Sequence, residues 1–168
     1  GKKMITFKKF KNSDIDILYI WLNKDHVKRF WYPDCEYSFE EIHAKYSKKL
    51  MNDDTNMFII VIDDIEVGFI QSYIVDDPKL FNSTEEMVGI DLFIGDINYI
   101  KKGNGPLVIR EFIDSVISKN IKFVGIDPEV SNVFAIKCYK KVGFKHIKTE
   151  FSNTEKKMTY YMVYERKI

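Results

Sequence analysis

The chain has 168 residues, of which 45% are hydrophobic and 15% aromatic, with only eight glycines and four prolines. This composition supports a folded domain with a sizeable core and excludes disordered, low-complexity and repeat proteins. The 26 basic and 25 acidic residues leave a net charge of +1. No basic helix or alternating basic and aromatic run points to nucleic acid, and no apolar run reaches the length of a bilayer.

We therefore expect residues 1–168 to form a single domain, with residues 1–3 before Met4 as a cloning remnant. Without an apolar signal core, a cytoplasmic location with reduced thiols is expected. A nucleophilic cysteine–histidine enzyme stays open in principle, although no local signature supports it, and no spacing indicates a metal site. The residues concerned are Cys35, Cys138, His26, His43 and His146.

The first half of the chain predicts a strand, two or three helices and a hairpin. Ser13 and Ser38 are N-cap candidates, and Glu41 completes a capping box with Ser38. The expected elements are a strand over residues 4–10, helices behind Ser13, over residues 25–30 and behind Ser38, and strands over residues 57–62 and 67–75.

The second half predicts a strand–loop–helix–strand unit that follows the antiparallel strands. Ile109, Phe112, Ile113, Val116 and Ile117 share one face of a helix, and Gly143 ends the next helix. The expected elements are strands over residues 87–94 and 121–126, a helix from Ser131 to about Val142, and strands over residues 144–151 and 158–165. This order predicts an α/β (α+β) fold, a mixed sheet with helices on both faces.

A glycine loop lies between the strand over residues 87–94 and the next helix. Its residues are Lys101, Lys102, Gly103, Asn104, Gly105 and Pro106. Glycines let the backbone approach a diphosphate, a helix N-terminus directs N–H groups at it, and the lysines add charge. Pro106 suits a first helical turn. A strand-to-helix turn without a ligand remains the alternative, whereas a P-loop is excluded because no Gly-Lys-Ser/Thr ends the loop.

A second motif follows about 27 residues later, in Asn132-Val133-Phe134-Ala135-Ile136-Lys137-Cys138-Tyr139-Lys140-Lys141-Val142-Gly143-Phe144. Downstream of the glycine loop, this pattern resembles the GCN5-related N-acetyltransferase (GNAT) superfamily over nearly the whole chain. The resemblance implies a mostly antiparallel sheet of about seven strands and acetyl-CoA as co-substrate. It implies coenzyme contacts from the backbone of Leu92, Phe93 and Ile94, from the glycine loop, and from Asn132, Ala135 and Tyr139.

Four further segments resemble the aminoglycoside 6′-N-acetyltransferases, a group related to siderophore N-acyltransferases. These segments are residues 19–23, 67–73, 89–95 and 126–128. Ile100 departs from the general GNAT loop, which carries Gln or Arg there, so phosphate contacts would come from the backbone. The resemblance implies acetyl transfer to the 6′-amine of aminoglycoside antibiotics, and hence antibiotic resistance.

Asp91 is the first candidate catalytic residue. It interrupts an apolar strand, and a carboxylate there costs several kcal/mol unless it has a partner. A bound ammonium would be one partner, and a local lysine or backbone N–H would be another. The resemblance implies that Asp91 holds and deprotonates the amine, directly or through water, that a backbone N–H of residues 91–93 stabilises the oxyanion, and that Tyr139 protonates the leaving thiolate.

The acceptor is expected to be a small cationic amine, which acidic side chains would attract. The candidate substrate-binding residues are Trp21, Tyr32, Gln71, Tyr73, Asp91 and Asp127. For the aromatic residues, plain core packing is the alternative. Other functions left open are a GNAT enzyme acting on a siderophore hydroxylamine, a polyamine or a protein N-terminus, and a coenzyme-binding module without catalysis. We expect a monomer or homodimer.

Overall fold

The computed structural model describes residues 2–33, 36–52 and 54–167. Its strands form a seven-stranded sheet in the order β1-β2-β3-β4-β5-β7-β6. The pairs β1–β2, β5–β7 and β6–β7 are antiparallel and β4–β5 is parallel. The expected mixed, mostly antiparallel sheet is therefore confirmed. No helix in the described part of the chain combines the length and apolarity that a membrane crossing needs.

The strands are β1 (Ile5–Lys9), β2 (Thr55–Ile62), β3 (Ile65–Ile74), β4 (Met87–Ile94), β5 (Phe123–Ile126), β6 (Lys145–Ser152) and β7 (Lys157–Glu165). The α-helices are α1 (Ile15–Leu22), α2 (Asp25–Trp31), α3 (Phe39–Leu50), α4 (Asn104–Ser115) and α5 (Val133–Val142). The short 3-10 helices are η1 (Asn12–Asp14), η2 (Pro78–Phe81) and η3 (Ile97–Tyr99).

The observed helix starts confirm one of the three N-cap candidates. Ser38 caps α3 as expected: its side chain accepts from the Glu41 N–H, and the Glu41 carboxylate accepts from the Ser38 N–H, both at 3.1 Å. The expectation for Ser13 was wrong, because Ser13 lies inside η1 and Asp14 precedes α1. The expectation for Ser131 was wrong by one residue, because Asn132 caps α5.

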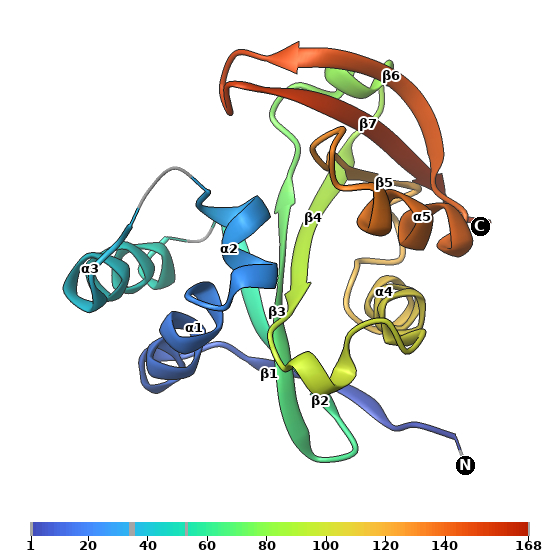
Figure 1. The fold of residues 1–168 in the computed structure, drawn as a ribbon. Coiled ribbons are helices and arrows are strands. Elements are labelled where there is room, and N and C mark those ends of the chain that lie inside the picture. Colours follow the sequence, from blue (N-terminus) through green and yellow to red (C-terminus); the bar gives the residue numbers. More distant parts are fainter. Residues whose placement is uncertain (1, 34–35, 53, 168) are drawn as a thin grey trace. The chain divides into compact units, whose positions relative to one another are not determined.

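Contacts divide the chain into two compact units, Gly1–Ser72 with Asp91–Asn104, and Tyr73–Ile90 with Gly105–Ile168. In the first unit, helices α1 to α3 (blue to cyan in Figure 1) pack through an apolar core on β2, β3 and the end of β4. Phe69 and Phe93 stack at 5.9 Å within that core. The expectation of a single domain remains a prediction. β3 and β4 each contribute residues to both units.

The second unit holds the start of β4, β5, the β6–β7 hairpin and helices α4 and α5. Figure 1 shows α4 (yellow) and α5 (orange) as neighbours in this unit. Ile109, Phe112 and Ile113 of α4 are each at most 2% exposed, so this part of the expected apolar face is buried. The expectation that Val116 and Ile117 belong to the helix was wrong, because α4 ends at Ser115; Val116 is half-buried and Ile117 is buried beyond the helix. Gly143 ends α5 at a φ of 119°, a conformation that favours glycine.

Candidate active site

Asp91 lies half-buried in β4, directly after the buried Ile90. The Gln71 Nε2 atom donates a hydrogen bond to Asp91 Oδ2 at 3.1 Å. Gln71, on β3, is only 8% exposed. The carboxylate that interrupts an apolar strand therefore has a side-chain amide as partner, which offsets part of its desolvation cost.

Lys49, which sequence reasoning missed, lies next to this pair. It comes from the last turn of α3, and its Nζ atom donates to Gln71 Oε1 at 3.3 Å. Burial lowers the pKa of Lys49 below its usual 10.5, the charge of Lys45 lowers it further, and the Asp91 carboxylate opposes both. No local pattern marks Lys49, because its contact with Gln71 joins residues 22 positions apart in the chain.

Three tyrosines surround the same lysines. The Tyr32 and Tyr46 hydroxyls lie 3.0 Å apart, and Lys45 Nζ lies 4.4 Å from the Tyr32 ring centroid and 5.5 Å from that of Tyr37. Burial raises the pKa of Tyr46, with smaller contributions from Tyr32 and Asp91. Tyr32, which is predicted to bind the acceptor substrate, thus belongs to the aromatic cluster that faces the charges around Asp91.

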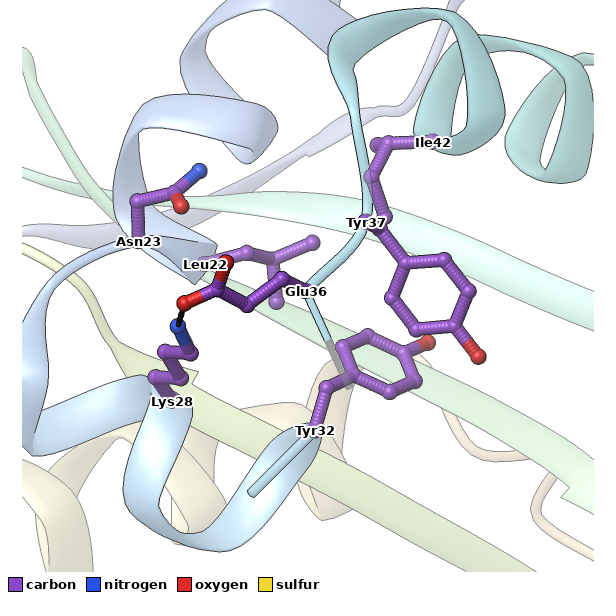
Figure 2. Close-up of a pocket in the computed structure, with 7 residues that line it drawn as sticks. All are labelled: Leu22, Asn23, Lys28, Tyr32, Glu36, Tyr37 and Ile42. Atoms are coloured by element: carbon purple, nitrogen blue, oxygen red, sulfur yellow. Dashed lines mark hydrogen bonds and ion pairs between the residues drawn. The ribbon is translucent and has the colours of Figure 1, made fainter. Parts of the chain in front are cut away.

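Tyr32 and Tyr37 also line an open pocket in the first unit. Figure 2 shows their rings on one side and the Lys28–Glu36 ion pair, 3.3 Å long, on the other. The remaining lining residues are Leu22, Asn23 and Ile42. Charged and aromatic side chains together suit a polar ligand with an apolar surface.

Trp21 packs underneath the end of β4. It is 4% exposed, and its ring forms an edge contact with Phe93 at 6.1 Å. A Cβ atom added at Gly95 would lie 2.1 Å from the Trp21 Cγ atom. This burial gives Trp21 a packing role and leaves little of its surface for an acceptor.

The hydrogen bonding between β3 and the end of β4 is irregular. The N–H groups of Gly95 and Asp96 both donate to the Val67 carbonyl, at 2.7 and 3.0 Å, which is the pattern of a β-bulge. The His26 Nε2 atom donates to the Ile94 carbonyl at 2.9 Å. Bulges of this kind re-aim a strand, and this one fixes the backbone of the segment predicted to hold the coenzyme arm.

The glycine loop turns through two left-handed residues. Lys101 has a φ of 56° and Gly103 a φ of 78°. A Cβ at Gly103 would meet nothing within 4 Å, so its backbone conformation, and not crowding, is what favours glycine there. Lys101, Lys102 and Gly103 are exposed directly before α4. Loops with left-handed residues gather N–H groups into concave sites that bind anions.

Asn104 acts inside the loop. It is 2% exposed, its Nδ2 atom donates to the Tyr99 carbonyl at 2.9 Å, and its Oδ1 atom accepts from Lys3 Nζ. The side chain therefore braces the loop, which leaves the Asn104 backbone as the group that a phosphate could reach.

Gly105 is required by packing in the second unit. A Cβ at this position would lie 2.7 Å from Cys138 Sγ on α5. The sequence interpretation, in which Gly105 lets the backbone approach a diphosphate, did not foresee this contact. Pro106 falls in the first turn of α4, where its missing N–H costs no hydrogen bond.

We expect Gly105→Ala to destabilise the protein by about 1–3 kcal/mol, the usual cost of overpacking. Thermal unfolding measures the loss. Because the clash is with one sulfur atom, Cys138→Ala should restore most of the stability in the double variant. If Cys138→Ala gives no recovery, the close approach of α5 is not what selects glycine.

Helix α5 carries three predicted coenzyme residues. The Asn132 side chain accepts from the Ala135 N–H at 3.3 Å and so caps the helix. Tyr139 is 8% exposed and packs near Phe144, with ring centroids 6.1 Å apart. Burial raises the pKa of the Cys138 thiol to about 11, which disfavours it as a nucleophile. Cys35, the other thiol considered, lies outside the described residues.

Two residues that are predicted to bind the acceptor substrate lie in the second unit. The Tyr73 ring lies across Gly89, where an added Cβ would come within 2.5 Å of it. Asp127 directly follows β5 and is half-buried. Burial raises the pKa of Tyr161, and the charge of Asp127 adds to that effect. Asp127 is thus a carboxylate close enough to interact electrostatically with the phenol of Tyr161.

Comparison with known proteins identifies the family. The profile of the acetyltransferase (GNAT) domain matches residues 11–150. The chain belongs to the GNAT acetyltransferases. An aminoglycoside N(6′)-acetyltransferase type 1 from Klebsiella pneumoniae is 25% identical over 148 residues, which cover 84% of this chain and 74% of that protein.

Solved GNAT structures share the fold. Aminoglycoside acetyltransferase AAC(6′)-Ib in complex with coenzyme A matches with a TM-score of 0.84 at 24% identity, over 97% of this chain and 95% of that one. Spermidine N-acetyltransferase from Vibrio cholerae, in complex with coenzyme A and spermine, matches with a TM-score of 0.75 at 16% identity, over 96% and 95%. The GNAT fold expected from the sequence motifs is confirmed.

Proposed function

We propose that this GNAT acetyltransferase transfers the acetyl group of acetyl-CoA to the 6′-amine of aminoglycosides. The observation that carries the proposal is the half-buried Asp91 carboxylate on β4, held by Gln71. An aminoglycoside N(6′)-acetyltransferase 25% identical to the chain supports the choice of acceptor.

The reaction joins a neutral amine to a thioester carbonyl, so a carbon–nitrogen bond forms and the carbon–sulfur bond breaks. Asp91 anchors the substrate ammonium and takes its proton, directly or through water. A backbone N–H of residues 91–93 stabilises the tetrahedral oxyanion. Tyr139 returns a proton to the thiolate of coenzyme A.

Acetyl-CoA is the co-substrate in this proposal. The left-handed loop at Lys101 and Gly103 and the N-terminus of α4 receive its diphosphate. Backbone groups of Leu92, Phe93 and Ile94 bind the pantetheine arm. Asn132 and Ala135, at the start of α5, contribute further coenzyme contacts.

We assign acceptor binding to side chains of each unit. In the first unit, Tyr32 offers an aromatic face, Asp91 a negative charge and Gln71 an amide, and the buried Trp21 supports them from the core. In the second unit, Tyr73 offers a phenol and Asp127 a negative charge. Confinement of the molecule to the cytoplasm and a role in antibiotic resistance belong to the same proposal.

Lys49 favours a second candidate acceptor, a siderophore-type hydroxylamine such as N-hydroxylysine. The Lys49 ammonium interacts with Asp91 and bonds to Gln71, so it adds a positive charge beside two of the predicted acceptor residues. A positive charge there repels a polycation, but it attracts an acceptor that carries a carboxylate besides its reacting nitrogen.

Thiol release from acetyl-CoA tests the proposal with kanamycin, tobramycin, N-hydroxylysine, spermidine and a ribosomal peptide. We expect release with kanamycin and tobramycin at least tenfold above the rate without acceptor. An aminoglycoside with a hydroxyl in place of the 6′-amine is the matched control and should give only the background rate. Release with N-hydroxylysine alone would transfer the proposal to the second candidate, and no release with any acceptor would indicate a coenzyme-binding module.

A further inference from the structure

We infer that Lys49 and Gln71 are positioning residues that orient the Asp91 carboxylate for the reaction. The inference rests on the proposed function, in which Asp91 holds the reacting amine. Both side chains act through Asp91 in this scheme.

The direction of the Gln71 amide is the centre of the argument. An amide can present either its oxygen or its nitrogen to a neighbour, but a lysine ammonium can only donate. Because Lys49 Nζ lies 3.3 Å from one end of the amide, that end must be Oε1. The opposite end is then Nε2, which donates to Asp91 Oδ2 at 3.1 Å. Lys49 thereby determines which group of Gln71 the carboxylate meets.

Burial makes this arrangement specific. Gln71 is 8% exposed on β3, so its amide has little water to satisfy the end that is not bonded. If the amide were reversed, its oxygen would face the Asp91 oxygen and its nitrogen would face an ammonium. Both contacts would be repulsive, and the buried amide would lose both of its hydrogen bonds.

The positive charge of Lys49 also favours the ionised form of the Asp91 carboxylate. The groups that face Lys49 are Lys45 on α3, the Tyr46 ring at 5.2 Å, and Asp91 on β4. A nearby cation favours the ionised form of a carboxylate. Since burial and Lys45 lower the pKa of Lys49, its ammonium is lost at a lower pH than that of an exposed lysine. The enforced amide direction is present below that pKa and is lost above it.

The alternative is that Lys49 only covers the Tyr46 ring. A double-mutant cycle separates the two roles, using Lys49→Met, Gln71→Met and the double variant with whichever acceptor the wild type acetylates. We expect kcat to fall about five- to tenfold in each single variant, with the KM for acetyl-CoA within twofold of the wild type. The double variant should be no slower than Gln71→Met, because Lys49 acts through Gln71.

Two variants on the same helix serve as controls. Lys48→Met changes an exposed neighbour and should leave kcat within twofold. Lys49→Arg keeps a donor and a positive charge and should recover most of the wild-type kcat. Multiplicative losses in the double variant, or a Lys49→Met protein that loses only thermal stability, would overturn the inference.

The titration of Asp91 provides a readout that needs no turnover. In ¹³C spectra of the carboxyl groups, the midpoint of Asp91 should move to higher pH in Lys49→Met than in the wild type, and Lys48→Met should not move it. If no acceptor supports turnover, the proposed function fails, but this measurement still decides the positioning role. An Asp91 midpoint that is the same in Lys49→Met and the wild type contradicts it.

Discussion

Asp91→Asn should lower kcat about 100-fold or more, because a positioned acid–base group typically contributes a factor of about 10² to 10⁴. A factor of about 100 corresponds to about 2.7 kcal/mol of transition-state stabilisation. The variant should fold, since the side-chain oxygen of the introduced asparagine can still accept from Gln71 Nε2. Steady-state thiol release with saturating acetyl-CoA measures the effect.

The control for this experiment is Asp25→Asn, which removes an equal charge from an exposed position in the first turn of α2. It should leave kcat within twofold. Calorimetric binding of acetyl-CoA should be unchanged in Asp91→Asn, because the coenzyme is assigned to backbone groups and to the glycine loop. Wild-type turnover by Asp91→Asn would remove the residue from the mechanism, and lost coenzyme affinity would assign it a binding role.

Local sequence signals predicted most of the fold. Periodicity located the strands and helices, and the Ser38–Glu41 capping box was confirmed because both partners lie within four residues. The helix starts at Ser13 and Ser131 were wrong for different reasons. Asn132, one residue after Ser131, accepts from the Ala135 N–H and caps α5. Ser13 lies inside η1, and the Asp14 side chain accepts from the Lys11 N–H at the start of η1 and makes no cap bond to α1.

The site was less predictable, because its decisive contacts join residues far apart in the chain. Asp91 stood out as a charge in an apolar strand, but its partner Gln71 is 20 residues away and Lys49 is 22 residues before Gln71. Lys49 in the sequence looks like any lysine near a helix C-terminus, where such charges favour the dipole. Only the pairing of strands and the packing of α3 reveal that it lies beside the predicted catalytic carboxylate.

In the glycine loop, the sequence identified the important residues but not the physical reason for each. The sequence correctly marked Gly103 and Gly105 as special and grouped them under one explanation. The structure separates them: Gly103 has a positive φ, whereas Gly105 is required by Cys138, a residue on a different helix. A motif records which residues are needed at a place, and the reason for each can differ.

Arg166→Met should lower the free energy of unfolding by about 3 kcal/mol or more, since hydrogen bonds to charged groups contribute about 1.5–3 kcal/mol each. Arg166 is 9% exposed. It donates to four carbonyls at and beyond the end of α4. These are Ser118 at 2.6 Å, Ile121 at 3.1 Å, Ile113 at 2.6 Å and Ile117 at 3.3 Å. Methionine would leave these carbonyls without this donor, and denaturant unfolding would record the loss.

The matched control is Lys167→Met, which removes an exposed charge from the next residue and should cost less than about 0.5 kcal/mol. Arg166→Lys should recover only part of the loss, because a single ammonium cannot reach four carbonyls that the planar guanidinium reaches with two nitrogens. Full recovery by lysine would show that charge, and not the fork of donors, stabilises the helix end. Since the glycine loop lies at the opposite end of α4, the folded fraction of Arg166→Met should bind acetyl-CoA with wild-type affinity. A weaker affinity would mean that the C-terminal end of α4 helps to fix the coenzyme loop.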